Sequence, residues 1–585
     1  MVPDYKVTGS NAAAAFSLTA YRGDGMVLLA MNWRGGEPPA DFVGFAITYK
    51  APLGTSFFPL DNLLTFPDEV DPNHSPQSTH SPFQRFRWVH FPKTFFDDGA
   101  CSYQVTARHM NADNTLRDGD SQSVEIVVGG ETYPGQLDVT YTRGFLSSQA
   151  FVRNFTDPDG ILPGPADDPL TFTTTADPKK KGALPWMGFG ARYAILQVLD
   201  EALATPDATV DVIAYDLNER EIVDSLVALG TRLRIIVDDS VDPRNKKLTY
   251  PPAKDTGHGA DDSPETRAVA RLVASAGADH VIRQHMGNLQ HNKTIVVRGS
   301  TIQRAVCGST NFSWRGMYVQ NNNAIVFRTP ESVAPFAAAF DAYFSHKSRF
   351  RSRPESAGWI PLNLTGIDAQ VAFSPHSDAH AMLGAIADDI RTAKKSVFYS
   401  LAFLYQTPGS IMNAISAVTN DDSIFVYGIS DKRVGGIVLH KDAANPVPIA
   451  PASLVDGKTP FPFSVEPSIN GGIQMHHKFI VIDANTPDAR VYVGSFNFSS
   501  SSDTSNGENL LLIRDQRIAS SFMVQALSMF DHYSYRIMFQ DAPLPDEKGL
   551  LPMTLKTPPR AAGEVPWWTP YFTPGVKQRD RELFG

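Results

Sequence analysis

The sequence predicts an α/β protein whose larger part is an internal duplication and whose N-terminal part is an all-β domain. Three observations predict this class. Short segments of alternating apolar and polar residues fill the chain to about residue 142, helix-type and strand-type patterns alternate beyond residue 187, and two polar motifs recur at a constant offset. With 585 residues and 42% hydrophobic side chains, the chain is long enough for two to four globular domains.

The N-terminal domain, residues 1–150, is predicted from its short alternating segments. They are FSLTAY, MVLLAMNW, FVGFAITYK, QRFRWVHF, CSYQVTAR, SVEIVV and LDVTYT. Polar or Gly/Pro turns separate them, and Asp24–Gly25 is a typical hairpin pair. Seven strands over this length predict an antiparallel sandwich of immunoglobulin or fibronectin type.

Two segments of unusual composition mark the ends of the duplicated part. Residues 151–186 are rich in Pro, Thr and Gly and carry the run Lys179–Lys181, which predicts a solvated linker. Residues 541–585 form a Pro-rich tail. Its aromatic cluster consists of Trp567, Trp568, Tyr571 and Phe572. Because Pro-rich segments need an anchor to be ordered, we expect the tail to pack back on a domain, with contact to a lipid interface as the alternative.

The duplicated part has two predicted halves, residues 187–365 and 366–540. In the first, ARYAILQVLDEALA, TVDVIAYDL, EIVDSLVALG and RLRIIVDD read as helix, strand, helix and strand. In the second, AHAMLGAIADDIRTA, SVFYSLAFL, GSIMNAISAV and SIFVYGIS repeat that succession. Mixed sheets flanked by helices are therefore expected in both halves.

Two polar motifs confirm the repeat at the level of single residues. The first runs QHNKTIVV from Gln290 and HHKFIV from His476; the second runs GSTNFS from Gly308 and GSFNFS from Gly494. The offsets agree to within one residue, since 476 − 291 = 185, 494 − 308 = 186 and 508 − 322 = 186. Two separate motifs that keep one offset exclude coincidence.

The residue types in these motifs suit a bound phosphate. His476 and Lys478 are two residues apart, so in a strand both side chains lie on the same face. The lysine supplies charge, Ser495 and Asn497 supply neutral donors, and the imidazole supplies a nucleophile or proton donor. The neighbouring His477 points to the other face and is predicted to be structural.

With these residues the chain resembles the phospholipase D superfamily, whose mark is two copies of HxKx4D followed by GSxN. The second copy matches in full and includes the downstream acid. Its residues are His476, Lys478, Asp483, Gly494, Ser495, Asn497 and Glu508. The first copy departs in two places, because Arg298 stands where Asp is expected and Asn322 where Glu508 has its counterpart. The resemblance covers about residues 184–539 and implies two phospholipase D-like domains.

The resemblance also implies a chemistry: a covalent phosphohistidine intermediate that water or an alcohol then attacks. The expected catalytic residues are His291, Lys293, Asn311, His476, Lys478, Asn497 and Glu508. Ser309, Ser495 and Asn322 are expected to bind the substrate. Because two lysines and two amides stabilise the charge on phosphate, no metal and no cofactor is expected. By strand parity Asp483 faces away from the pocket and braces the structure, and so does Arg298.

The two histidines are expected to differ. A carboxylate raises the pKa of an adjacent imidazole more than an amide does, so Glu508 is expected to raise the pKa of His476 relative to His291. This favours His476 as the initial acid and His291, near Asn322, as the nucleophile. A carboxylate that instead stabilises a cationic phosphohistidine is the counter-argument.

Composition constrains the substrate only weakly. The net charge of −10 and a pI near 5.8 provide no global basic field, so a nucleic acid would need a local groove. Unlike halves favour an asymmetric diester such as a phospholipid, handled by a monomer with or without peripheral membrane contact. An endonuclease acting on DNA or RNA is the alternative, because the run from Gly494 to Asn509 resembles the family's endonucleases, and a non-catalytic binding module is the third.

The compartment is left open by the sequence. The N-terminus shows no basic segment before a sustained apolar core, so no signal peptide is expected; cytoplasmic is the default and secretion the alternative. Cys101 and Cys307 lie far apart in the chain and are expected to be free buried thiols.

Overall fold

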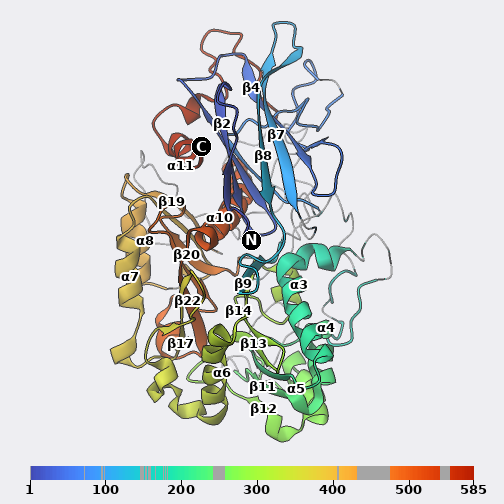
Figure 1. The fold of residues 1–585 in the computed structure, drawn as a ribbon, viewed down its shortest axis with the longest axis vertical. Helices are drawn as coiled ribbons and strands as arrows, with labels where there is room; N and C mark the ends of the chain where they lie inside the picture. Colours follow the sequence, from blue (N-terminus) through green and yellow to red (C-terminus); the bar gives the residue numbers. More distant parts are fainter. Residues whose placement is uncertain are drawn as a thin grey trace.

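The fold is described from a computed structural model of the chain. It describes residues 2–585 except 63, 72, 94–96, 98, 145–150, 152–154, 156–159, 165, 176, 178–179, 181, 241–256, 405–406, 431–474 and 541–553. Lys179 and Lys181 of the expected linker and the first part of the tail therefore lie outside the described residues. Figure 1 shows an all-β domain above two α/β halves that lie side by side.

The N-terminal domain consists of two four-stranded antiparallel sheets. One contains β1 (Lys6–Thr8), β2 (Phe16–Arg22), β3 (Val27–Trp33) and β6 (Arg87–His90); the other contains β5 (Phe58–Pro59), β4 (Phe42–Lys50), β7 (Ala100–Met110) and β8 (Leu116–Val127). Phe16, Phe45 and Tyr103 belong to one core between them. The hairpin at Asp24–Gly25 is confirmed, with both residues at positive φ (47° and 92°). The all-β character is thus established, while the immunoglobulin or fibronectin type stays a prediction.

The last strand expected in this domain belongs elsewhere. β9 (Leu137–Tyr141) pairs antiparallel with β15 (Asn323–Phe327) of the first half. The expectation that LDVTYT completes the sandwich is therefore wrong. Alternation within a strand shows that one face is buried, but it does not show which strand lies beside it.

Each half contains a seven-stranded mixed sheet. The first has the order β12 (Val281–Arg283), β11 (Leu233–Val237), β10 (Thr209–Ala214), β13 (Lys293–Arg298), β14 (Gln303–Gly308), β15, β9. The second has the order β16 (Ile360–Pro361), β17 (Asp368–Ser374), β22 (Glu508–Arg514), β21 (Arg490–Gly494), β20 (Lys478–Ile482), β18 (Ser396–Leu401), β19 (Phe425–Ile429). Read in reverse, the second order matches the first from β11 to β9, and the parallel pairs β10–β11 and β18–β19 correspond. The duplication is confirmed, and β9 is the counterpart of β17.

Helices cover both faces of the paired sheets. On the outer side of the first half lie α3 (Ala183–Ala204), α4 (Arg220–Leu229) and α5 (Pro264–Ala276); on the outer side of the second lie α7 (Leu383–Arg391) and α8 (Ser410–Thr419) (Figure 1). α6 (Pro330–Ser345) and α10 (Gln516–Gln540) contribute to the core that both halves share. Thr329 caps α6 through a reciprocal pair with Ser332, and Pro330 occupies its first turn.

Short helical segments complete the chain. They are η1 (Gly230–Arg232), η2 (Ala278–His280), η3 (Arg315–Val319), η4 (Lys347–Ser352), η5 (Pro354–Ser356), η6 (Asp378–His380), α9 (Ser500–Thr504) and η10 (Thr569–Tyr571). Within the described ranges, no helix is both long and apolar enough to cross a bilayer. Cys101 and Cys307 are buried free thiols, as expected.

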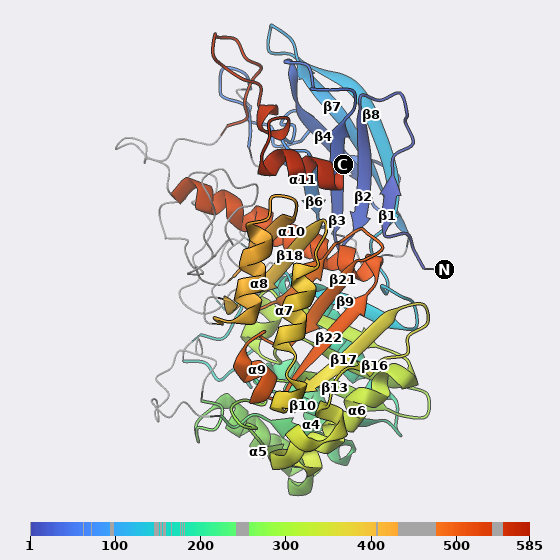
Figure 2. The ribbon, with the colours of Figure 1, turned by 90° about the vertical axis from the view of Figure 1, so that its left-hand side faces the viewer.

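The described part of the tail, from residue 554, packs on the N-terminal domain. Trp567 and Trp568 are buried in that domain's core, and the Trp567 indole donates to the Phe42 carbonyl at 2.9 Å. α11 (Val576–Phe584) lies along β3, and Asp580 pairs with Arg87 at 2.7 Å (Figure 2). The prediction that the tail packs back on a domain is confirmed, and these tryptophans are not available to lipid.

The segment expected to be a solvated linker is in part a core segment. Phe151, Ile161 and Leu170 are buried against the outer helices of the first half. α3 also begins at Ala183, ahead of the expected boundary at residue 187. Apolar side chains spaced among Pro and Gly were enough to anchor this segment, although they have no helix or strand period.

Candidate active site

The two halves meet where the motif strands begin. Gln290 forms a parallel bridge with Gly507, and Asn321 forms the equivalent bridge with Met475. The residues after these bridges, His291 and His476, are both buried. The site is therefore built from both halves at once, at the ends of β13, β15, β20 and β22.

Each imidazole is held by a residue of the opposite half. His291 Nδ1 donates to Glu508 Oε2 at 2.7 Å, and His476 Nδ1 donates to Asn322 Oδ1 at 2.9 Å. The orientation of the Asn322 amide is fixed, because its Nδ2 donates to the Gly316 carbonyl. The expectation that Glu508 lies beside His476 is thus wrong. Strand parity places residues on one face of one sheet, but the partner of each histidine depends on how two sheets face each other.

The pKa values follow this exchanged pairing. Burial lowers the pKa of His291, and the Glu508 carboxylate opposes that shift. Burial lowers the pKa of His476 further, and the charges of Lys478 and Lys293 add to the effect. Burial would raise the pKa of Glu508, but His291 and Lys293 outweigh it and keep the group ionised. The order expected from the sequence, with His476 the more basic, is therefore reversed.

The two lysines occupy equivalent positions. Lys293 Nζ donates to the carbonyl of His291 at 2.5 Å, and Lys478 Nζ donates to the carbonyl of His476 at 2.6 Å. Each ammonium also lies near an aromatic ring, Tyr215 at 4.7 Å for Lys293 and Phe403 at 5.9 Å for Lys478. Two buried cations beside two imidazoles make a strongly anion-attracting site.

Two asparagines present unpaired polar atoms. Asn311 is 1% exposed, and neither its Oδ1 nor its Nδ2 has a hydrogen-bond partner among the described residues. Oδ1 of Asn497 is likewise buried without one. Buried amides are nearly always paired, so these groups are suited to a ligand.

The serine of each GSxN motif accepts a hydrogen bond from the backbone. Ser309 Oγ accepts from the backbone N–H of Asn323 in the neighbouring strand β15. Ser495 Oγ accepts from the backbone N–H of Asn509 in the neighbouring strand β22. Gly494 precedes Ser495 because any side chain there would collide: a Cβ would lie 2.3 Å from the Asn509 carbonyl oxygen. The role of both serines in binding substrate stays a prediction.

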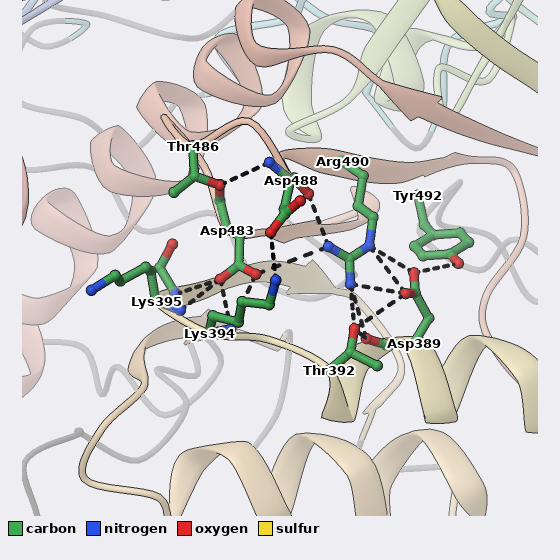
Figure 3. Close-up of polar contacts among 10 residues, drawn as sticks. Asp389, Thr392, Lys394, Lys395, Asp483, Thr486, Asp488, Arg490 and Tyr492 are labelled. Atoms are coloured by element: carbon green, nitrogen blue, oxygen red, sulfur yellow. Dashed lines mark hydrogen bonds and ion pairs between the residues drawn. The ribbon is translucent and has the colours of Figure 1, made fainter.

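Asp483 and Arg298 face away from the pocket and bind the scaffold. Figure 3 shows the Asp483 carboxylate accepting from the backbone N–H groups of Lys394 and Lys395, at 2.7 to 3.0 Å; Ser396 adds a third. Arg298 instead donates to Asp211 on β10 at 2.6 Å. The substitution in the first copy therefore changes the bracing of the strand rather than the catalytic groups.

His477 and a further histidine are part of the surrounding framework. His477 lies against Asn323 (3.0 Å) and Gln525 (3.1 Å), as expected of a structural residue. Sequence reasoning missed His258, which pairs with Asp216 at 2.7 Å and with Asp238 at 2.9 Å. The two carboxylates outweigh burial and raise the pKa of His258 well above its usual value.

The His258 cluster reaches the site through two contacts. Asp238 Oδ1 accepts from the backbone N–H of Gln290, next to His291, at 2.7 Å. The Tyr215 ring lies between the rings of His258 (4.5 Å) and His291 (4.6 Å). These residues are scattered over three segments and share no spacing, so no sequence signal could have found them.

Comparison with known proteins places this site in a family. The domain family described as "Cardiolipin synthase, PLD-like domain" matches residues 196–345 and 386–530. No curated protein matches. The three solved structures that follow are each similar in part.

Polyphosphate kinase from Porphyromonas gingivalis is 11% identical, with a TM-score of 0.34, over 61% of this chain and 51% of that one, so this chain spans about half of the kinase. Phosphatidylserine synthase from Haemophilus influenzae Rd KW20 is 9% identical over 58% and 84%, with a TM-score of 0.37. The phospholipase D family member Nuc from Salmonella typhimurium is 24% identical over 28% and 95%, with a TM-score of 0.18. Because the family match covers both halves, the chain belongs to the phospholipase D superfamily.

Proposed function

We propose that this protein is a phosphodiesterase that works without a metal through a phosphohistidine on His291. The observation that carries the proposal is the bond between His291 Nδ1 and Glu508. Since a carboxylate only accepts, Nδ1 carries the proton and Nε2 keeps its lone pair for attack. The same carboxylate stabilises the positive charge that the ring gains when phosphorus binds Nε2.

In the first step, Nε2 of His291 attacks phosphorus and the bond to the leaving oxygen breaks. His476 donates a proton from its own Nε2 to that oxygen. Its low pKa leaves it neutral in the free protein, so protonation is coupled to binding: the negative diester offsets the charges of Lys293 and Lys478. Those lysines, with Asn311 and Asn497, are placed to hold the non-bridging oxygens.

In the second step, neutral His476 removes a proton from water or an alcohol. The resulting oxygen attacks phosphorus, the bond to His291 breaks, and the ring returns to its neutral form. Water gives hydrolysis and an alcohol gives transfer. His476 releases this proton when the product leaves, because its pKa in the free protein is low, so both rings end the cycle in their starting form.

A phospholipid is the favoured substrate. Within the described residues, the all-β domain exposes Leu53 (81%), Phe57 (44%) and Phe58 (60%) around one loop, and Lys50 Nζ lies 5.7 Å from the Phe57 ring. Exposed apolar side chains beside a cation suit the boundary of a membrane. The matching family is also named for cardiolipin synthase. A monomer with peripheral membrane contact fits this proposal.

A nuclease is the second candidate, favoured by the run from Gly494 to Asn509. One experiment separates the two: pure protein with chelator is incubated with phosphatidylcholine vesicles and, separately, with single- and double-stranded DNA. Head-group release that is lost in His291→Ala and His476→Ala supports the phospholipid. DNA cleavage lost in both supports the nuclease, and no turnover of either points to a binding module. His74→Ala, on the surface of the all-β domain, is the matched control and should keep full activity.

A further inference from the structure

Arg143 follows a residue that contacts the active site. The preceding residue, Thr142, exchanges backbone and side-chain hydrogen bonds with Asn322, at 3.0 and 2.9 Å. Asn322 in turn holds His476. Arg143 therefore follows Thr142, which is linked to His476 through Asn322.

Three aromatic rings surround the Arg143 guanidinium. Its central carbon lies 4.2 Å from the centroid of Phe189, 4.8 Å from Trp186 and 5.4 Å from Phe91. Two rings come from α3 and one from the segment after β6, so the cage joins the first half to the all-β domain. The faces of a guanidinium in such a cage are covered, and only its edge of N–H donors is left to bind a partner.

This guanidinium has no anionic partner in the part of the chain that the structure describes. Arg143 is 8% exposed, its Nε is buried without an acceptor, and none of the described carboxylates pairs with it. Two other buried arginines differ: Arg22 pairs with Asp24, and Arg87 pairs with Asp580. Burial lowers the pKa of Arg143 to about 9, so it is still charged at neutral pH. A buried, charged and unpaired arginine is costly unless it binds an anion.

The cage is maintained against local strain. Phe189 has φ 46° and ψ −139°, inside α3 and between two glycines. A bulky side chain rarely adopts positive φ, and residues strained in this way are concentrated at functional sites. Here the strained residue supplies the ring closest to the guanidinium.

We propose that Arg143 and its three rings form a second oxyanion subsite, linked to the catalytic pair through Thr142 and Asn322, which binds a carboxylate or phosphate group. The group would be part of a lipid headgroup or a free phosphate ion. The headgroup arm of this inference rests on the proposed phospholipid activity. The phosphate arm does not, since it requires only binding.

The first arm measures binding of inorganic phosphate to the full-length protein by isothermal titration calorimetry. Arg143→Gln is expected to lose one of two phosphate equivalents, the other being held by Lys293 and Lys478. Arg304→Gln, which removes an arginine paired with Glu201 away from the site, should leave the isotherm unchanged. If circular dichroism shows that Arg143→Gln does not fold, Arg143→Lys is measured in its place, because lysine keeps the positive charge but lacks the paired N–H donors of a guanidinium. The affinity for the second phosphate should then fall about 10-fold.

The second arm compares headgroup release from phosphatidylserine and phosphatidylcholine vesicles. If the subsite reads a headgroup carboxylate, Arg143→Gln lowers kcat/KM for phosphatidylserine about 10-fold or more and changes phosphatidylcholine less than about 2-fold. Loss of phosphate binding with an unchanged lipid ratio assigns the subsite to free phosphate. An unchanged isotherm together with an unchanged ratio overturns the proposal. If neither lipid is turned over, the proposed activity fails while the titration still tests the subsite.

Discussion

The two halves have sheets with the same strand order and differ in the charged residues at the strand ends. At the site, Glu508 of the second half corresponds to Asn322 of the first; at the ends of β20 and β13, Asp483 corresponds to Arg298. The hydrogen bonds cross between halves, so the carboxylate of the more regular copy serves the imidazole of the less regular one. A residue that departs from the family pattern in one copy therefore changes the surroundings of the histidine in the other copy.

The largest effect is expected from replacing the histidines. His291→Ala and His476→Ala should each lower kcat by about 10⁴-fold or more on a natural diester, because nucleophile and acid act as a unit. On a p-nitrophenyl phosphodiester, whose leaving group needs no proton, His476→Ala should still form the covalent adduct and fail to release it. Mass spectrometry of the trapped protein should then find phosphate on His291.

Phosphate on His476 in the wild-type protein would overturn this assignment and exchange the roles of the halves. His74→Ala again provides the control, since its ring lies on the surface. Retained activity in His291→Ala would show that the first half is not required for chemistry.

The next effect comes from exchanging the partners of the two imidazoles. Glu508→Gln should lower kcat by about 10²–10³-fold. It also removes the group that raises the pKa of His291, so the acidic limb of kcat, which requires neutral His291 in the substrate complex, should move to lower pH. The measurement is the pH profile of kcat, which reports the protein with substrate bound.

Asn322→Asp is the reciprocal change. A carboxylate beside His476 raises its pKa, so the basic limb, which requires protonated His476, should move to higher pH by about one unit or more. Movement of the opposite limb in either variant would contradict the crossed pairing. Glu331→Gln, on the surface of α6, should leave the profile unchanged.

A smaller effect, on stability, is expected from Asp483 and Arg298, which hold the ends of β20 and β13 to the scaffold. Asp483→Ala leaves one buried and two partly buried backbone donors without their acceptor and should reduce the free energy of unfolding by about 2–4 kcal/mol. Arg298→Ala should cost at most about 1 kcal/mol, because its side chain is partly exposed and Asp211 still pairs with Arg234. Urea denaturation measures both. Equal losses would show that the two strand ends are braced equally.

The smallest effect is expected at the neighbours of the histidines. His477 contacts Asn323, and its counterpart Asn292 accepts from Asn509 at 2.8 Å. His477→Ala and Asn292→Ala should each cost about 1–2 kcal/mol of stability and change kcat less than about 3-fold. A kcat loss in His477→Ala as large as that in His476→Ala would give His477 a catalytic role.

Much of this architecture follows from the sequence. The near-equal offsets of the two motifs establish the duplication, and strand parity places His477 on the other strand face from His476. Period and spacing describe one element at a time. They do not state which sheet β9 joins, nor that Glu508 reaches across to the other half. Those facts depend on how elements distant in the sequence pack together.

The position of the tail has a consequence for how the chain is made. The core of the all-β domain includes Trp567, whose indole bonds to a carbonyl 525 residues earlier. At about 5–20 residues per second, a ribosome delivers that indole roughly 25–105 seconds after the strand that receives it. During that interval the all-β domain presents an unfinished apolar surface. Its final stability therefore depends on a segment translated long after its strands, and a chaperone that covers β4 in the meantime would have to leave before the tail can dock.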